Sequence, residues 1–110
     1  MSTTARVCLI GAGAAGLAAG KALADRGLAF DWFEKGSMVG GLWRIDNDNG
    51  GAAAYRTLHL NSSRTRTEYP SYPRPADWPD FPSHELVATY FPRFAEDNDL
   101  LGRITFGTAV

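Results

Sequence analysis

Cysteine and long apolar runs are what this 110-residue sequence has least of. The single cysteine, Cys8, excludes an intrachain disulfide and a CxxC redox pair. One cysteine fits a reducing compartment, and we expect a cytoplasmic location. The first six residues lack the apolar core of a signal peptide, and no apolar run approaches the ~20 residues of a membrane span. The sequence therefore predicts neither a secretory leader nor a membrane span.

Charge of one sign is also scarce. Eleven Lys and Arg stand against twelve Asp and Glu, for a formal net charge of -1. No global basic field exists to attract nucleic acid or an anionic membrane, and a homo-oligomer stays open. The only two histidines, His59 and His84, are far apart in the sequence, and we expect no metal site.

Glycine and proline, in contrast, are abundant. The chain has twelve Gly and six Pro, and five of the prolines lie in residues 35–82. That segment shows no long periodic element, although residues 55–60 could hold a short strand. An irregular stretch of this length is uncommon unless it has a function. We expect it to wrap a large ligand.

The first 34 residues predict a strand, a helix and a second strand. The run Val7-Cys8-Leu9-Ile10 suits a strand buried on both faces of a parallel sheet, where Cys8 would be inert. Residues 14–26 are rich in Ala and Leu and predict a helix that Gly27 ends. Residues 29–33 predict the second strand.

A second helix and a third strand are predicted in the last 28 residues. Ser83 is a good N-cap, and apolar residues recur near helical spacing as far as Phe94. Pro92 has no N–H for the carbonyl of Ala88, so we expect a kink or an early break there. Residues 103–110 predict a strand. The fold class is therefore α/β, a partial Rossmann-like parallel sheet of three strands in the order 3-2-1.

A GxGxxG pattern follows the first strand and opens the first helix, as dinucleotide-binding sites require. Its members are Gly11, Ala12, Gly13, Ala14, Ala15 and Gly16. Gly11 permits the tight turn, Gly13 lets a pyrophosphate approach the backbone, and Gly16 and Gly20 let the helix pack closely on the strand. The free N–H groups at the helix N-terminus would then face the phosphates.

Glu34 ends the second strand, where an acid binds the ribose of an adenosine. Its carboxylate would accept hydrogen bonds from both ribose hydroxyls. Because an acid there repels a 2′-phosphate, this site should hold FAD or NAD and not NADP.

Further motifs extend the pattern beyond a dinucleotide fingerprint. They are Phe33-Glu34-Lys35, Val39-Gly40-Gly41-Leu42-Trp43, Leu58-His59-Leu60-Asn61-Ser62-Ser63 and Asp77-Trp78-Pro79-Asp80-Phe81-Pro82-Ser83-His84. Together with the glycine motif they resemble the N-terminal part of flavin-containing monooxygenases, over essentially the whole chain.

The resemblance implies FAD as cofactor and NADPH as reductant of the complete enzyme. Such enzymes oxygenate soft N or S nucleophiles with O2 through a flavin C4a-hydroperoxide. It implies that residues 11–15 meet the FAD pyrophosphate and that Leu42 and Trp43 line the flavin side. Asn61 and Ser62 would lie near the isoalloxazine ring, and Leu60 and Asn61 beside the nicotinamide. Asn61, whose amide donates, accepts and does not titrate, is the candidate catalytic residue.

Length is where the sequence departs from that family, whose members are several times longer and carry a second glycine motif for NADPH. Residues 1–110 would be the N-terminal portion of one FAD-binding domain, without the NADPH-binding domain. Two alternatives stay open. One is a Baeyer–Villiger or other flavin oxidoreductase, and the other is a truncated, non-catalytic protein that binds a nucleotide or a partner chain.

Overall fold

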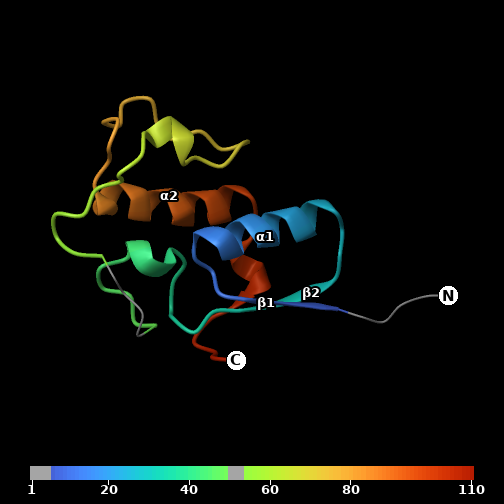
Figure 1. Ribbon diagram of the computed structural model, residues 1–110. Coiled ribbons are helices and arrows are strands. Elements are labelled where there is room, and N and C mark those ends of the chain that lie inside the picture. The colour runs from blue at the N-terminus through green and yellow to red at the C-terminus, as the bar shows by residue number, and fades with distance from the viewer. Residues whose placement is uncertain (1–5, 50–53) are drawn as a thin grey trace.

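Three short parallel strands carry the fold of this computed structural model, which describes residues 6–49 and 54–110 (Figure 1). Strand β2 (Phe30–Phe33) lies between β1 (Val7–Ile10) and β3 (Ile104–Thr105). Val7 pairs with Phe30, and Trp32 pairs with Ile104. The predicted α/β class, the parallel pairing and the strand order are confirmed. Residues 50–53, part of the predicted irregular segment, lie outside the described residues, as do residues 1–5.

Strand β1 is more exposed than the sequence predicts. Val7, Cys8 and Ile10 are exposed and only Leu9 packs against the core. The expectation of a strand buried on both faces, with Cys8 buried in it, was therefore wrong, because the Cys8 side chain is exposed. β1 is an edge strand with β2 as its only partner in the described sheet. Both described α-helices lie on the same side of the three strands (Figure 1), so the other face of β1 is not covered by a helix.

Helix α1 (Ala14–Asp25) follows the prediction closely. Gly27, two residues after the last helical residue, adopts φ +64° and ends the helix, and the N–H of Leu28 donates to the carbonyl of Leu23 at 3.1 Å. Glycine adopts this left-handed backbone without the steric penalty of a side chain. The buried residues of α1, Leu17 and Gly20, turn toward the sheet and the core.

Helix α2 (His84–Asp97) begins where the sequence predicts, with the Ser83 hydroxyl accepting from the N–H of Leu86 at 3.5 Å. The expected early break at Pro92 was wrong, because the helix continues for five residues beyond it. The buried face explains this outcome. Val87, Tyr90, Phe91, Phe94 and Ala95 are all buried, and their burial outweighs one missing backbone hydrogen bond.

Strand β3 is shorter than the predicted residues 103–110. It pairs with β2 over two residues, and Gly107 then turns the chain with φ +64°. The chain continues beside the end of β2, because the N–H of Thr108 donates to the carbonyl of Glu34 at 3.0 Å and that of Gly107 donates to the carbonyl of Gly36 at 2.9 Å.

The described parts of residues 35–82 contain no α-helix and no β-strand, only the 3-10 turns Gly41–Trp43 and Arg64–Arg66. The strand expected in residues 55–60 is reduced to one isolated bridge between His59 and Ser83. In Figure 1 the later part of this segment rises beyond α2, on the side away from the strands.

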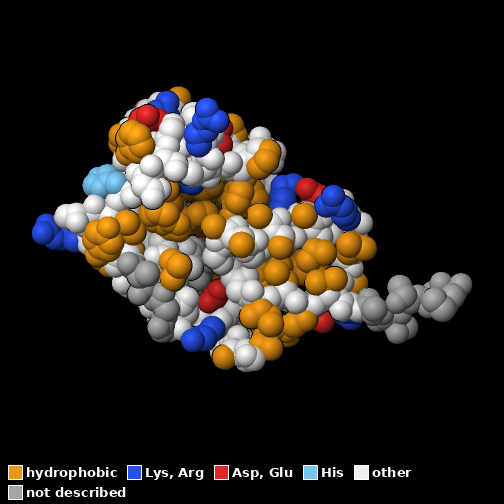
Figure 2. Space-filling model, viewed as in Figure 1, with side chains coloured by type: hydrophobic (Ala, Val, Ile, Leu, Met, Phe, Trp, Pro, Cys, Tyr) orange, Lys and Arg blue, Asp and Glu red, His pale blue; other side chains and the backbone are white. Residues whose placement is uncertain are grey.

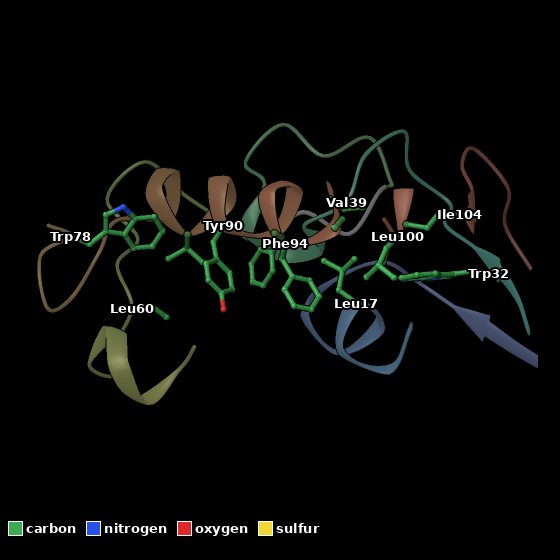
Figure 3. Packing of buried hydrophobic residues seen from close by; sticks show 13 residues of the cluster. Leu17, Trp32, Val39, Leu60, Trp78, Tyr90, Phe94, Leu100 and Ile104 are labelled. Atoms are coloured by element: carbon green, nitrogen blue, oxygen red, sulfur yellow. The ribbon is translucent and has the colours of Figure 1, made fainter. Parts of the chain in front are cut away.

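One apolar cluster joins these elements (Figure 3). Trp32 of β2, Leu17 of α1 and Leu100 after α2 are fully buried at its centre, next to Phe94. Leu60 and Trp78 extend the cluster along α2 into the irregular segment. The same core therefore holds the glycine motif and the irregular segment in place.

Candidate functional site

The turn from β1 into α1 is the centre of the candidate site. Gly11 adopts φ +98°, a conformation that residues with a side chain rarely adopt. Its N–H donates to the carbonyl of Phe33 at 2.8 Å, and its carbonyl accepts from the indole N–H of Trp32, also at 2.8 Å. Gly11 therefore makes the tight turn that the sequence predicts, and two hydrogen bonds with β2 stabilise that turn.

Close packing accounts for two further glycines. A Cβ built on Gly16 would lie 2.1 Å from the carbonyl oxygen of Gly11, and one built on Gly20 would lie 2.3 Å from the Trp32 ring. Real Cβ atoms do not approach other atoms so closely. Both positions thus need glycine so that α1 can lie against the sheet.

Gly13 is glycine for a different reason. A Cβ there would have nothing nearer than the Cα of Gly41, at 3.5 Å, and the φ of Gly13 is −80°. The protein itself therefore has room for a side chain at this position. The space next to Gly13 belongs to a cleft, where a pyrophosphate could reach the backbone.

The N-terminus of α1 carries no cap. Its N-cap residue is Gly13, no side chain accepts a capping hydrogen bond, and the first turn has no acidic residue. The first intrahelical bond runs from the N–H of Leu17 to the carbonyl of Gly13 at 2.9 Å. The N–H groups of Ala14, Ala15 and Gly16 precede it and leave an uncompensated positive end, which suits an anion.

Glu34 is buried, with 4% of its surface exposed. Its Oε1 accepts from the N–H of Ala12 at 2.7 Å, and its Oε2 accepts from the N–H of Gly36 at 2.6 Å. The carboxylate thus fastens the glycine loop to the end of β2, a role that the sequence did not predict. A carboxylate has about four acceptor sites, so two remain for ribose hydroxyls.

Gly40 and Gly41 press a second loop against the glycine motif. The N–H of Gly40 donates to the carbonyl of Ala12 at 3.0 Å, and a Cβ on Gly41 would lie 2.9 Å from the Cα of Gly13. Asn47 Nδ2 donates to the carbonyl of Gly41 at 2.8 Å and steadies this second loop. The two motifs, far apart in the sequence, therefore meet at their backbones.

A cleft of about 370 Å³ opens between these loops. We call it the glycine cleft; its lining comprises Ile10, Gly11, Gly13, Ala14, Ala15, Gly16, Gly40, Gly41, Leu42 and Trp43. Ile10 and Leu42 on its rim are 63% and 58% exposed, so an apolar ligand surface could cover them. Ala12 is fully buried and does not line the cleft, and its N–H already bonds Glu34.

A second cleft, of about 280 Å³, lies at the end of β2. We call it the acidic cleft; its lining comprises Ile10, Gly11, Glu34, Lys35, Asn49, Thr108, Ala109 and Val110. Both clefts include Ile10 and Gly11, so together they form one elongated site across the carboxyl ends of β1 and β2. The carboxylate lies at one end and the uncapped helix at the other.

Leu60, Asn61 and Ser62 line neither of these two clefts. Leu60 is 8% exposed and belongs to the core, and its N–H donates to the carbonyl of Pro82 at 2.9 Å. Asn61 and Ser62 are exposed, and the Ser62 hydroxyl donates to Asn61 Oδ1 at 3.5 Å. The predicted contacts of these three residues with flavin and nicotinamide stay predictions.

Three residues that support the site were missed by the sequence reasoning. Trp32 and Asn47 hold the carbonyls of the two glycine loops, and the Tyr69 hydroxyl donates to the carbonyl of Ala14. A side chain that bonds a backbone carbonyl has no sequence spacing to reveal it. Only the fold brings these pairs together.

On the face drawn in Figure 2, hydrophobic side chains occupy the middle, and Lys and Arg lie mainly toward the rim.

No helix within residues 6–49 and 54–110 is both long and apolar enough to cross a membrane. The site is elongated, with the buried Glu34 carboxylate at one end, the uncapped N-terminus of α1 beyond the turn, and the exposed apolar side chains of Ile10 and Leu42 on its rim.

Comparison with known proteins shows which family the chain belongs to. A family model described as "Flavin-binding monooxygenase-like" matches residues 4–110. The chain is 36% identical over 107 residues to flavin-containing monooxygenase 3 of Macaca mulatta, and 38% identical over 107 residues to flavin-containing monooxygenase 5 of Oryctolagus cuniculus. Both matches cover 96% of this chain and 20% of the relative. The chain thus spans about a fifth of the length of the curated relatives it matches.

Solved structures of monooxygenases have a similar fold. The S-allyl-L-cysteine S-oxygenase of Allium sativum superimposes with a TM-score of 0.83 at 27% identity, over 96% of this chain and 28% of that one. An oxidised steroid monooxygenase bound to NADP superimposes with a TM-score of 0.78 at 26% identity, over 96% of this chain and 20% of that one.

Proposed function

Because this chain belongs to the flavin-binding monooxygenase-like family, we propose that it forms the FAD-binding N-terminal portion of a monooxygenase that oxygenates soft N or S nucleophiles with NADPH and O2. The observation that carries the proposal is the elongated site itself. An acid, a side-chain-free backbone and an uncapped helix N-terminus follow one another along it. The proposed location is the cytoplasm.

The residues present fit FAD at both ends. In the acidic cleft, Glu34 would accept hydrogen bonds from the adenosine ribose with the acceptor sites that Ala12 and Gly36 leave open. In the glycine cleft, Gly13 leaves space for a pyrophosphate, and the N–H groups of Ala14, Ala15 and Gly16 would donate to it.

The flavin end of the cofactor would extend past Leu42 and Trp43. These side chains line the glycine cleft beyond the uncapped helix, and Leu42 is exposed enough to be covered by an aromatic ring. When bound, FAD would supply the redox chemistry that accepts a hydride from NADPH and activates O2. The protein's part is to bind the cofactor, orient it and exclude water.

Asn61 is proposed as the residue that hydrogen-bonds the reacting part of the flavin or the nicotinamide. Its amide donates and accepts without titrating, so its action would not vary with pH. The turn that carries it is anchored, because the N–H of Arg64 donates to the carbonyl of Asp80 at 2.8 Å and that of His84 to the carbonyl of Leu58, also at 2.8 Å.

Isotope labelling tests the proposal most fully. The complete enzyme, loaded with FAD, is given NADPH, a tertiary amine or a thioether, and ¹⁸O₂. The expected product is an N-oxide or S-oxide that carries one ¹⁸O atom, detected by mass spectrometry. If the protein binds FAD and consumes NADPH but yields no labelled product from either substrate class, the proposed oxygenation is wrong.

A further inference from the structure

We propose that Tyr69 is a positioning residue for the pyrophosphate loop, and that its hydroxyl orients the N–H of Ala15 toward the bound phosphates. The inference rests on the proposed function for the identity of the ligand. It goes beyond that function because it assigns a role to a residue outside the glycine motif, in the irregular segment.

The inference rests on a hydrogen bond between two residues that lie 55 positions apart in the sequence. The Tyr69 hydroxyl donates to the carbonyl oxygen of Ala14 at 2.5 Å. That carbonyl and the N–H of Ala15 belong to one planar peptide unit and point in opposite directions. The hydroxyl is thus a second donor to this carbonyl, beside the hydrogen bond of the helix itself, and acts on the peptide unit that carries the Ala15 N–H, one of the uncapped groups at the start of α1.

The same contact also polarises the peptide unit. A hydrogen bond accepted by a carbonyl strengthens the bond that the N–H of that peptide donates. Tyr69 would thus act on the side of the peptide away from the ligand and improve the Ala15 N–H as a donor on the near side. The stronger Ala15 donor should therefore favour a ligand group that accepts from the helix N-terminus, such as a phosphate.

Aromatic packing holds the Tyr69 ring in place for this contact. Its centroid lies 4.4 Å from that of Phe94 and 5.6 Å from that of Tyr90, both on the buried face of α2. Phe91 stands edge-on at 6.3 Å. The ring is therefore clamped by a helix and does not depend on the loop around it.

The backbone of Tyr69 is fixed as well. Its N–H donates to the hydroxyl oxygen of Tyr90 at 2.9 Å, and the Tyr90 hydroxyl donates in turn to the carbonyl of Tyr72. The N–H of Tyr72 closes the turn on the carbonyl of Tyr69 at 3.0 Å. Tyr69 is thus anchored on α2, and its hydroxyl bonds the first residue of α1.

Protonation favours the same role. Burial raises the pKa of the Tyr69 hydroxyl above its ordinary value. The hydroxyl therefore keeps its proton at neutral pH and is a donor toward Ala14.

Tyr72 provides a matched control. It lies in the same turn, and its ring packs against the same Tyr90 and Phe94, at 5.3 Å from each. Its hydroxyl, however, donates to the Asp97 carboxylate and not to the glycine loop. Tyr72→Phe and Tyr69→Phe each remove one hydroxyl from this turn, but only the second removes the contact with Ala14.

The binding experiment compares three ligands on the wild type and both variants: FAD, ADP and adenosine. ADP retains the pyrophosphate and adenosine does not. Tyr69→Phe should weaken FAD and ADP about five-fold, as expected for one neutral hydrogen bond, and leave adenosine unchanged. Tyr72→Phe should change none of the three. An unchanged ADP affinity in Tyr69→Phe, or an equal loss for adenosine, would overturn the proposal.

A second readout needs no ligand. The Ala15 amide resonance of the free protein should shift in Tyr69→Phe, while Tyr72→Phe leaves it as in the wild type. If the wild type bound neither FAD nor ADP, the proposed function would fail, and the Ala15 amide would still decide the positioning contact. An Ala15 amide that is the same in wild type and Tyr69→Phe overturns the inference.

Discussion

At the scale of single residues, the glycines of one motif answer different physical demands. Gly11 supplies a left-handed backbone conformation, Gly16 permits a close contact within the protein, and Gly13 leaves space in the glycine cleft. The sequence motif shows glycine at all three positions and does not tell these roles apart. The structure assigns a different role to each glycine, and each role can be tested by substitution.

Gly16→Ala should destabilise the fold. The new Cβ would meet the carbonyl oxygen of Gly11, a backbone atom that cannot move aside easily. We expect the free energy of unfolding to fall by about 1–3 kcal/mol, because overpacking outweighs the gain in helix propensity. Chemical denaturation measures it. Gly102→Ala is the control, since a Cβ there meets nothing within 4 Å, and an equally stable Gly16→Ala would contradict the packing.

Glu34→Gln should lower stability as well as cofactor affinity. The carboxylate accepts from two backbone N–H groups, and an amide would turn an NH₂ donor toward one of them. An unsatisfied buried donor costs about 1–3 kcal/mol. Denaturation and FAD titration of the same variant measure the two effects. Loss of FAD affinity with wild-type stability would show that the carboxylate serves the ribose alone.

Asn61→Ala is expected to separate binding from chemistry. The residue lines neither cleft, so FAD should bind as in the wild type. If Asn61 bonds the reacting part of the cofactors, its loss should weaken that stabilisation by about 1–3 kcal/mol. In the complete enzyme, less oxygenated product and more hydrogen peroxide should then form for each NADPH consumed. An unchanged ratio at full flavin occupancy would make Asn61 a structural loop residue.

At the scale of elements, α1 and α2 show what local sequence predicts well. Gly27 and Ser83 end and begin helices at the predicted positions, because caps depend on the conformation and hydrogen bonds of one or two residues. Pro92 and β1 show the opposite. Whether a helix tolerates a proline, or a strand is covered on both faces, depends on packing partners far away in the sequence.

The contact between α1 and β2 gives a prediction at this scale. Gly20→Ala would place a Cβ 2.3 Å from the Trp32 ring, which is 1% exposed and has no space to move into. Alanine favours a helix over glycine by about 1 kcal/mol. We expect the clash to win, with a net loss of about 1–2 kcal/mol and a weaker hold of Trp32 on Gly11. A thermal melt that shows Gly20→Ala more stable than the wild type would refute this contact.

At the scale of the whole molecule, the sequence predicts the fold class, the strand order and the glycine turn. It does not predict how the site is braced. Trp32 and Tyr69 bond the carbonyls of Gly11 and Ala14 from distant parts of the chain, and Asn47 bonds the carbonyl of Gly41 within its own loop. The two distant contacts depend on the crossover connections, which bring β2 and the irregular segment against the first turn of α1.

The same scale explains why the two clefts form one site. They meet at Ile10 and Gly11, where β1 ends, so a ligand that spans them must pass over the turn. The acid that we propose to bind one end of this ligand also fixes the turn, through its bond to the N–H of Ala12. In this proposal Glu34 couples ligand binding to the geometry of the turn.

Titration of FAD against the wild type and Gly13→Val tests whether the glycine cleft holds the pyrophosphate of the cofactor. Flavin fluorescence quenching gives the affinity, and the thermal melt of each protein gives the control for folding. We expect the wild type to bind FAD and Gly13→Val to lose binding while remaining folded, because the valine side chain would fill the space next to residue 13 in the cleft. Equal FAD affinity in the two proteins would contradict the assignment of the glycine cleft.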